Sequence, residues 1–265
     1  MICEIFDLQK IKCFRDIITN LCNIGNDIIM EVKRDYLSFR TINDLRTALP
    51  IIRINSVFFD NYEYKGSEMI FEITSKWLKM ALKYVTHMVN IKMEMIPDSF
   101  HFNLKILDCN EIEHICLLNI QNTDLPNALF DYSKVNVSLV CRTNVFYDVK
   151  KAFKCCNNVY LELNRINKMK CLIISSIESD KDLRSCKLLI QRNDECDPIF
   201  LNDSSIVKLS FSALEFKQCL SLCSLISQKI SIYVLEPGYP IMIKASLDKL
   251  ISVEMTLSTG LENLC

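Results

Sequence analysis

The sequence from Ser75 to Val89 reads SKWLKMALKYVTHMV and predicts an amphipathic helix. Its apolar residues recur every three or four positions, the spacing of one face of an α-helix: Trp77, Leu78, Ala81, Leu82 and Val85. Lys76, Lys79 and Lys83 follow the same spacing on the remaining side. The stretch therefore predicts a helix with one side that packs on a core and a basic side that faces away from it.

Three further segments have a helical pattern, and strand-like runs lie between them. Helices are expected at residues 8–23, with Asp7 as N-cap and Gly25 as stop signal, at residues 144–156, and at residues 212–225, where Ser212 and Glu215 have the spacing of a capping box. Strands are expected at residues 1–6, 27–33, 36–42, 48–55, 68–73, 89–96, 99–107, 112–120, 135–140, 159–163, 170–176, 184–192, 206–211, 229–235, 239–245 and 250–258.

The order of these elements repeats. Each half has a strand, a helix, four strands, a helix and three strands, and corresponding elements lie about 135–140 residues apart, which is typical of an internal duplication. The fold class is therefore α+β, with two similar domains in which two helices cover curved antiparallel sheets. We predict domains at residues 1–120 and 135–265. Residues 121–134, with their Asn, Asp and Pro residues, form the connector between them.

The duplicated arrangement resembles the sliding DNA clamp fold of proliferating cell nuclear antigen and its checkpoint relatives. The run LSFRTIN at residues 37–43, continued through Arg46 and Ala48 to SVFF at residues 56–59, is similar to the Rad-nine family after its first helix. Later stretches match in style and spacing: FSALEF at 211–216, ISIY at 230–233, PGYP at 237–240 and MTLS at 255–258. The resemblance covers almost the whole chain.

The resemblance implies a subunit of the nine-one-one DNA-damage checkpoint clamp. Such a subunit forms a heterotrimeric ring with Rad-one-like and Hus-one-like partners, encircles double-stranded DNA at damage sites in the nucleus, and works with a clamp loader and with repair and checkpoint proteins. Two alternatives are a homotrimeric replication processivity clamp and an adaptor that binds only proteins. The family usually carries a phosphorylated tail. This sequence ends at Cys265, so tail-dependent signalling is not expected of these residues.

In the clamp family the helices line the central hole, and the cations of the expected helices fit that role. Basic side chains opposite the apolar stripes would face the phosphates of DNA: Lys10, Lys12, Arg15, Lys76, Lys79, Lys83, Arg142, Lys150, Lys151, Lys154 and Lys217. The alternative is that they are solvated helix faces. The net charge of −1 fits a clamp, because a closed ring stays on DNA through its topology and needs only weak contacts.

Residue-by-residue matching to the family also implies a pocket for partner peptides beneath the connector. It would be lined by Ile42, Leu49, Leu125, Pro126, Pro240 and Thr256. For Ile42 and Leu49 the simpler interpretation is an ordinary place in the core. Arg46 matches a polar position that could alter which peptides bind. Ring closure needs exposed strand edges, which we expect near residues 105–116 and 181–192.

Several classes of protein are not supported. The sequence lacks the GxGxxG, GxxxxGK[ST], HExxH and GxSxG motifs, so we predict no enzyme and no cofactor. A zinc site is not expected because the 14 cysteines include no CxxC pair and only 3 histidines accompany them. The first 20 residues carry charges unlike a secretory signal, and no apolar run is long enough to cross a membrane, so we expect an intracellular protein with reduced thiols.

Overall fold

The computed structural model divides the chain into two compact units. It describes residues 1–64, 66, 68–95, 99–127, 130–146, 157–166, 169–176, 186–191, 196–200, 207–235 and 238–259. The first unit contains Met1–Asn127 and Ser246–Val253, and the second contains Ala128–Ala245 and Glu254–Cys265. The boundaries at residues 1–120, 121–134 and 135–265 stay a prediction, and each unit is described by itself.

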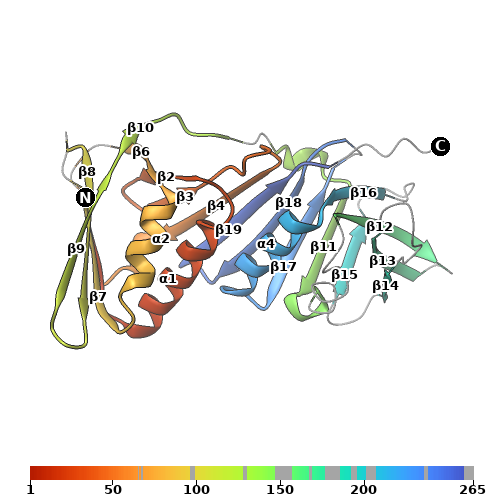
Figure 1. The fold of residues 1–265 in the computed structure, drawn as a ribbon. Coiled ribbons are helices and arrows are strands. Elements are labelled where there is room, and N and C mark those ends of the chain that lie inside the picture. The colour runs from red at the N-terminus through yellow and green to blue at the C-terminus, as the bar shows by residue number, and fades with distance from the viewer. Residues whose placement is uncertain are drawn as a thin grey trace. The chain divides into compact units, whose positions relative to one another are not determined.

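The first unit is built from two antiparallel sheets (Figure 1). One has the strand order β5-β1-β7-β8-β9, with β1 (Ile2–Ile5), β5 (Asn61–Glu63), β7 (Met88–Met95), β8 (His101–Asp108) and β9 (Glu113–Asn119). The other contains the order β10-β6-β2-β3-β4, with β2 (Asp27–Val32), β3 (Tyr36–Arg40), β4 (Ala48–Asn55), β6 (Met69–Thr74) and β10 (Gln121–Asn122). A short helix, η1 (Ser56–Phe58), follows β4.

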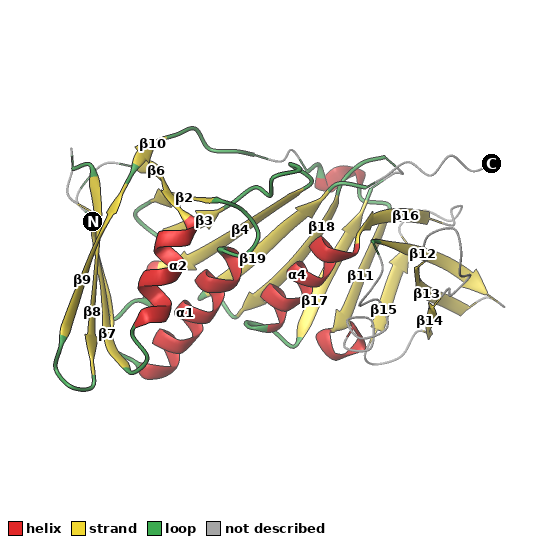
Figure 2. Cartoon of the chain, viewed as in Figure 1, coloured by secondary structure: helices red, strands yellow, loops and turns green. Residues whose placement is uncertain are grey.

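Two helices lie side by side on the strands of this unit, α1 (Leu8–Leu21) and α2 (Ser75–Tyr84) (Figure 2). The ring of Phe14 on α1 meets the ring of Phe39 on β3 edge-on, with 5.9 Å between centroids. Asp7 caps α1 as predicted, because its side chain accepts hydrogen bonds from the backbone N–H groups of Gln9 and Lys10. Burial of the apolar side of each helix places the core between helices and sheets.

The second helix is shorter than the sequence predicts. It ends at Tyr84, Val85 is extended, and Met88 begins β7, whereas the prediction continued the helix to Val89. The β-branched residues Val85, Thr86 and Val89 lose less side-chain freedom in an extended chain than in a helix. Val85 is buried as predicted, but as the residue that turns the chain into β7.

Gly25 has a different role from the predicted stop signal. Helix α1 ends at Leu21 with Cys22 as its cap, so the helix stops before the glycine. A Cβ atom at position 25 would lie 2.2 Å from Oγ1 of Thr41 and 2.3 Å from the carbonyl oxygen of Ile42. Glycine is therefore required by the close approach of another backbone.

Asp60 stabilises the start of α1 through hydrogen bonds and an ion pair. Its carboxylate accepts hydrogen bonds from the N–H groups of Phe6, at 2.6 Å, and Asp7, at 3.2 Å, and pairs with Nζ of Lys10 at 2.7 Å. Desolvation alone would raise the pKa of Asp60, but the hydrogen bonds from Lys10, Phe6 and Asp7 outweigh it and lower the pKa.

Replacing Asp60 by asparagine is expected to lower the free energy of unfolding at pH 7 by about 1–2 kcal/mol, because charge-assisted hydrogen bonds are lost. A carboxyl group with a lowered folded pKa stabilises the fold above its unfolded pKa, and the contribution disappears as the pH falls through the folded value. The difference between the two proteins in urea unfolding should therefore be largest at neutral pH and shrink below pH 3.8. An equal difference at both pH values would contradict this account.

The second unit repeats the plan of the first. Its sheets have the orders β18-β17-β11-β15 and β14-β13-β12-β16. The strands are β11 (Val137–Arg142), β12 (Asn158–Ile166), β13 (Met169–Ser176), β14 (Cys186–Gln191), β15 (Cys196–Phe200), β16 (Val207–Ser212), β17 (Lys229–Val234) and β18 (Ile241–Leu247). Strand β19 (Ile251–Leu257) begins in the first unit and ends in the second. A short helix, η2 (Tyr132–Lys134), precedes β11.

Helix α4 (Ala213–Ser224) matches the fourth predicted helix. Ser212 is its N-cap and accepts a hydrogen bond from the N–H of Glu215, as the capping-box spacing predicts. Phe216 of this helix is fully buried between the rings of Phe146 and Phe211. The third predicted helix begins at a short helix, η3 (Thr143–Phe146), and its residues 147–156 lie outside the described part of the chain.

Of the two strand edges predicted from the sequence, one lies partly in the wrong strand and the other agrees with the structure. The edge expected at residues 105–116 starts in β8, which pairs on both sides, so that part of the prediction is wrong and the outermost strand is β9. In the second unit β14 is outermost in its sheet, inside the predicted residues 181–192. Among the described residues, no helix is long and apolar enough to span a membrane.

Candidate nucleic-acid interface

Helix α2 has a basic outer side. Lys76 and Lys83 are exposed and Lys79 is half-buried, whereas the buried residues of the helix lie on its other side. No acidic residue occurs within α2. The charge of this surface is therefore positive along the full length of the helix, as the sequence predicts.

The three lysines of α2 border one hollow of about 770 Å³, which we call the α2 hollow. Its lining continues onto Asn26, Thr74 and Tyr84 and includes one acidic residue, Asp27. Nζ of Lys79 donates a hydrogen bond to Oδ1 of Asn23, just beyond α1, so this lysine is already oriented. Such a hollow, bordered by ammonium groups, can accept the phosphate oxygens of a nucleic-acid backbone.

The cations of α1 are more strongly neutralised. Lys10 is paired with Asp60, and its Nζ lies 5.9 Å from the ring centroid of Phe58. A guanidinium nitrogen of Arg15 lies 3.2 Å from the carboxylate of Asp16. Lys12 is exposed. The positive charge that α1 can offer to a phosphate is therefore smaller than that of α2.

In the second unit the predicted cations are spread over separate elements. Arg142 is exposed at the end of β11, and Lys217 is half-buried on α4. Lys150, Lys151 and Lys154 lie outside the described residues. A common DNA-facing surface of all eleven predicted residues thus stays a prediction, and the described part that comes closest to it is α2.

For the DNA-facing role expected from the sequence, replacing both Lys76 and Lys83 by glutamate should weaken the affinity for double-stranded DNA. Each phosphate contact that is lost should reduce the slope of log affinity against log salt by about 0.9, so the double variant should lower it by roughly 2. Titrations of double-stranded DNA at several salt concentrations, with the chain in the ring expected from the sequence, measure this slope. Lys249→Glu, at the exposed turn between β18 and β19, is the matched control and should leave the slope unchanged.

The six residues of the predicted peptide pocket have different surroundings. Leu49 is buried in β4 and Thr256 in β19, where Oγ1 of Thr256 lies 3.8 Å from the sulfur of Met242. Ile42, Leu125, Pro126 and Pro240 are half-buried. The first unit contains Ile42, Leu49, Leu125 and Pro126, and the second contains Pro240 and Thr256. The pocket itself stays a prediction.

An exposed apolar surface beside β9 was not predicted from the sequence. Ile115 and Leu117 on β9 are 56% and 60% exposed, and Trp77 and Tyr84 on α2 are 54% and 81% exposed. Trp77 and Leu117 border a common hollow of about 380 Å³, and the ring of Tyr84 lies edge-on to His114 of β9. We call these four residues the β9 patch. The prediction that Trp77 belongs to the buried side of its helix is therefore wrong.

The sequence of β9 contains a pattern from which the β9 patch could have been predicted. Residues 113–119 read EHICLLN, with apolar residues at both alternating sets of positions. In an antiparallel edge strand with one solvated face, only one set is expected to be apolar. Leu118 is buried while Ile115 and Leu117 are not, so the second apolar set faces outward at an open sheet edge. Such a surface is typical of a protein–protein contact.

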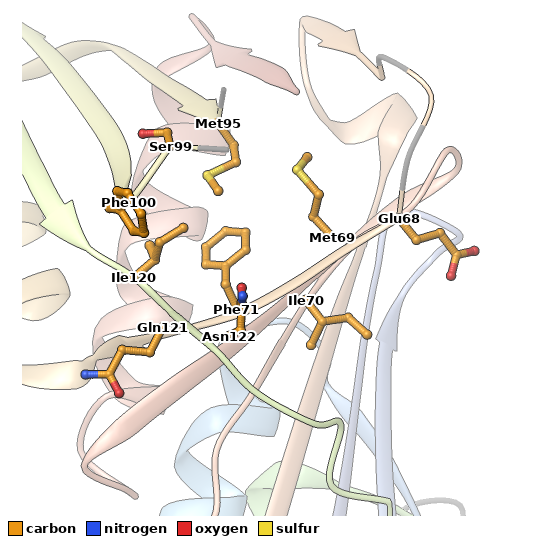
Figure 3. A pocket seen from close by; sticks show the side chains of 10 residues that line it. All are labelled: Glu68, Met69, Ile70, Phe71, Met95, Ser99, Phe100, Ile120, Gln121 and Asn122. Atoms are coloured by element: carbon orange, nitrogen blue, oxygen red, sulfur yellow. The ribbon is translucent and has the colours of Figure 1, made fainter. Parts of the chain in front are cut away.

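A further hollow, of about 660 Å³, lies where the predicted connector begins. Figure 3 shows Phe71, Met95, Phe100 and Ile120 around it, with Glu68 pointing away. Gln121 and Asn122 of β10 form part of its wall and pair with Glu72 and Phe71 of β6. The start of the connector is thereby held on β6 by a two-residue ladder.

Comparison with known families gives the identity of this architecture. The family model that matches the chain is Rad9, over residues 14–260. The chain belongs to the Rad9 family. None of the curated proteins is similar enough in sequence to match.

The fold of this Rad9-family chain is similar to that of a solved sliding clamp. The crystal structure of PCNA from Thermococcus kodakaraensis superimposes with a TM-score of 0.77 over 98% of this chain and 99% of that chain, at 12% sequence identity. A likeness at this low identity concerns the fold alone. The predicted α+β sliding-clamp fold and the resemblance to the Rad-nine family are both confirmed.

Four thiols of the first unit are shielded from solvent to different degrees: Cys3 and Cys22 are buried, and Cys13 and Cys116 are half-buried. Burial raises the pKa of Cys3 and of Cys22 to about 12, and it also raises the pKa of Cys13 and Cys116. A thiol with a raised pKa stays protonated at neutral pH and is a poor nucleophile or metal ligand. Within the described residues, no three histidine, cysteine or acidic side chains converge as a metal site would require.

Proposed function

We propose that this Rad9-family chain is one subunit of a heterotrimeric checkpoint clamp that encircles double-stranded DNA at sites of damage. The observation that carries the proposal is the match to the Rad9 family over residues 14–260, together with the sliding-clamp fold. Its partners in the ring are a Rad-one-like and a Hus-one-like subunit, and it acts in the nucleus. The chain serves as a scaffold for checkpoint and repair proteins and catalyses no reaction.

The basic outer side of α2 supports the DNA-binding part of the proposal. Lys76, Lys79 and Lys83 border the α2 hollow and can contact phosphates without reading bases. Weak contacts of this kind let a ring slide, because no single contact holds it at one sequence. The net charge of −1 agrees with this role, since a closed ring is kept on DNA by topology.

The sheet edges support the ring-forming part. Strand β9 ends one sheet of the first unit and β14 ends one sheet of the second. In a head-to-tail ring, the β9 edge of one subunit pairs with a second-unit edge of its neighbour, and the contact is heterologous. The exposed apolar side chains of the β9 patch would then be buried against that neighbour.

The mass of the chain in solution tests the proposal. The chain alone, of 30.8 kDa, should scatter light as a monomer, and with Rad-one-like and Hus-one-like subunits it should form a complex with one copy of each. A stable trimer of this chain alone would favour the alternative, a homotrimeric replication processivity clamp. A monomer in every mixture would reject both ring-forming functions.

A further inference from the structure

A buried ion pair lies on the sheet of the first unit, on the far side from its helices. Arg40 of β3 and Glu31 of β2 are 4% and 3% exposed, and Nη2 of Arg40 donates a hydrogen bond to Oε2 of Glu31. Along β3, Ser38 and Arg40 alternate with Leu37 and Phe39, and the ring of Phe39 meets α1. Ser38 and Arg40 therefore share the face that the helices do not cover.

The same arginine holds the predicted connector. Nη1 of Arg40 donates to Oδ1 of Asn127 at 2.9 Å and to the carbonyl oxygen of Pro126 at 3.4 Å. These acceptors lie 87 and 86 positions away in the sequence, and both belong to the first unit. Nε of Arg40 is buried and has no hydrogen-bond partner among the described residues. The guanidinium thus depends on Glu31 and on the connector for its hydrogen bonds.

The pair continues into a network that reaches β6. Nζ of Lys33 lies 3.4 Å from Glu31 and 3.4 Å from Glu68, which directly precedes β6. The connector begins on this same strand, where β10 pairs with β6. Thr123, Asp124 and Leu125 span the distance between β10 and the contact with Arg40, and within the described chain they make no backbone hydrogen bond to the sheets.

Burial of two charges is costly unless each of their hydrogen-bonding groups is satisfied. Here Glu31 accepts from Nη2 of Arg40, and the connector provides acceptors for Nη1. Lifting Pro126 and Asn127 from the sheet would remove acceptors from a guanidinium whose Nε already lacks a partner within the described part of the chain. The charge pair therefore favours one position of the connector over others.

We propose that Arg40 is a positioning residue that fixes the connector to β3 and so determines the space beneath it. The inference rests on the proposed function only for the role of the connector in peptide recognition. The position of the connector is a property of this chain alone. A peptide that docks beneath the connector would have to fit the space that the Arg40 contact leaves, beside Ile42 two positions further along the chain.

Limited proteolysis of the full chain tests this, because a protease needs a segment that can leave the surface. A protease that cleaves before aspartate can cut the Thr123–Asp124 bond, and mass spectrometry identifies the fragments. Asn127→Ala removes one charge-assisted acceptor at an exposed residue, so cleavage at this bond should become about tenfold faster. Asn110→Ala, at an exposed turn, is the matched control and should leave the rate unchanged.

A second variant removes the guanidinium that binds the connector. Glu31→Leu combined with Arg40→Met deletes both charges and should accelerate the same cleavage, while cleavage before exposed Asp248 serves as the internal reference. Unchanged cleavage at Thr123–Asp124 in both variants would overturn the inference. So would an equal acceleration at both bonds, because this would indicate general loosening. The assay uses no partner subunit, so its outcome is independent of whether a ring forms.

Discussion

Replacing Leu117 with arginine is expected to prevent this chain from joining the two proposed partner subunits while its own fold stays intact. Leu117 is 60% exposed on β9, so the longer, charged side chain can be solvated in the free chain. In the ring the same position would be covered by a neighbour, and an unpaired guanidinium there costs several kcal/mol. Association should weaken by at least roughly 100-fold.

The measurement is light scattering of an equimolar mixture with the two partner subunits. The unsubstituted chain should enter a one-to-one-to-one complex, and the Leu117→Arg chain should remain separate. Leu45→Arg is the matched control, because Leu45 is 77% exposed on the loop between β3 and β4. A complex that forms equally well with arginine at position 117 would place the ring contact somewhere other than the β9 patch.

Much of the fold could be predicted because it depends on local chemistry. Asp7 and Ser212 cap their helices as predicted, since an N-cap is decided by one side chain and the next three backbone N–H groups. Strand β4 coincides with its predicted range, although it contains Pro50, because four of its eight residues are Leu or Ile. At the end of α2 two local rules disagree, because apolar spacing predicts a longer helix and β-branched residues favour an extended chain. The chain is extended from Val85 onward.

Strand β15 (Cys196–Phe200) was missed for a physical reason. Its five residues read CDPIF, so Asp197 and Pro198, which cannot donate to a ladder, stand against a strand, and only Ile199 and Phe200 give a strong strand signal. Within the described sheet β15 pairs only with β11, so it is an edge strand, where a proline is tolerated. An edge position depends on the whole sheet and is not visible in five residues of sequence.

The candidate sites were predicted less well because they depend on pairs of residues distant in the sequence. The lysines of α2 were found from helical spacing, which is local. The contact between Arg40 and Asn127 joins residues 87 positions apart, and the sequence contains no pattern that links them. Trp77 was assigned to the wrong side because it lies at the border of the apolar arc, where spacing alone does not separate buried from exposed.

Replacing Arg40 alone with methionine is expected to lower the free energy of unfolding by about 3 kcal/mol at neutral pH, because it leaves the carboxylate of Glu31 buried with a weaker partner. Lys33, 3.4 Å away and 33% exposed, compensates only in part, because its ammonium group is also shared with Glu68. Urea or guanidinium unfolding of the two proteins gives the difference. Arg53→Met is the matched control. Arg53 is half-buried on β4 opposite Ser38, and its loss should cost less than about 1 kcal/mol.

Removal of both charges distinguishes the net contribution of the ion pair to stability from the penalty of leaving one buried charge unpaired. In Glu31→Leu combined with Arg40→Met, no buried charge is left unpaired, so most of the lost stability should return. The connector, however, still loses its guanidinium donor, and cleavage at Thr123–Asp124 should stay fast. A double variant that is stable but has a loose connector would mean that the pair is kept for the position of the connector. A double variant as unstable as Arg40→Met would mean that packing around the side chain, and not the charge of Glu31, accounts for the loss.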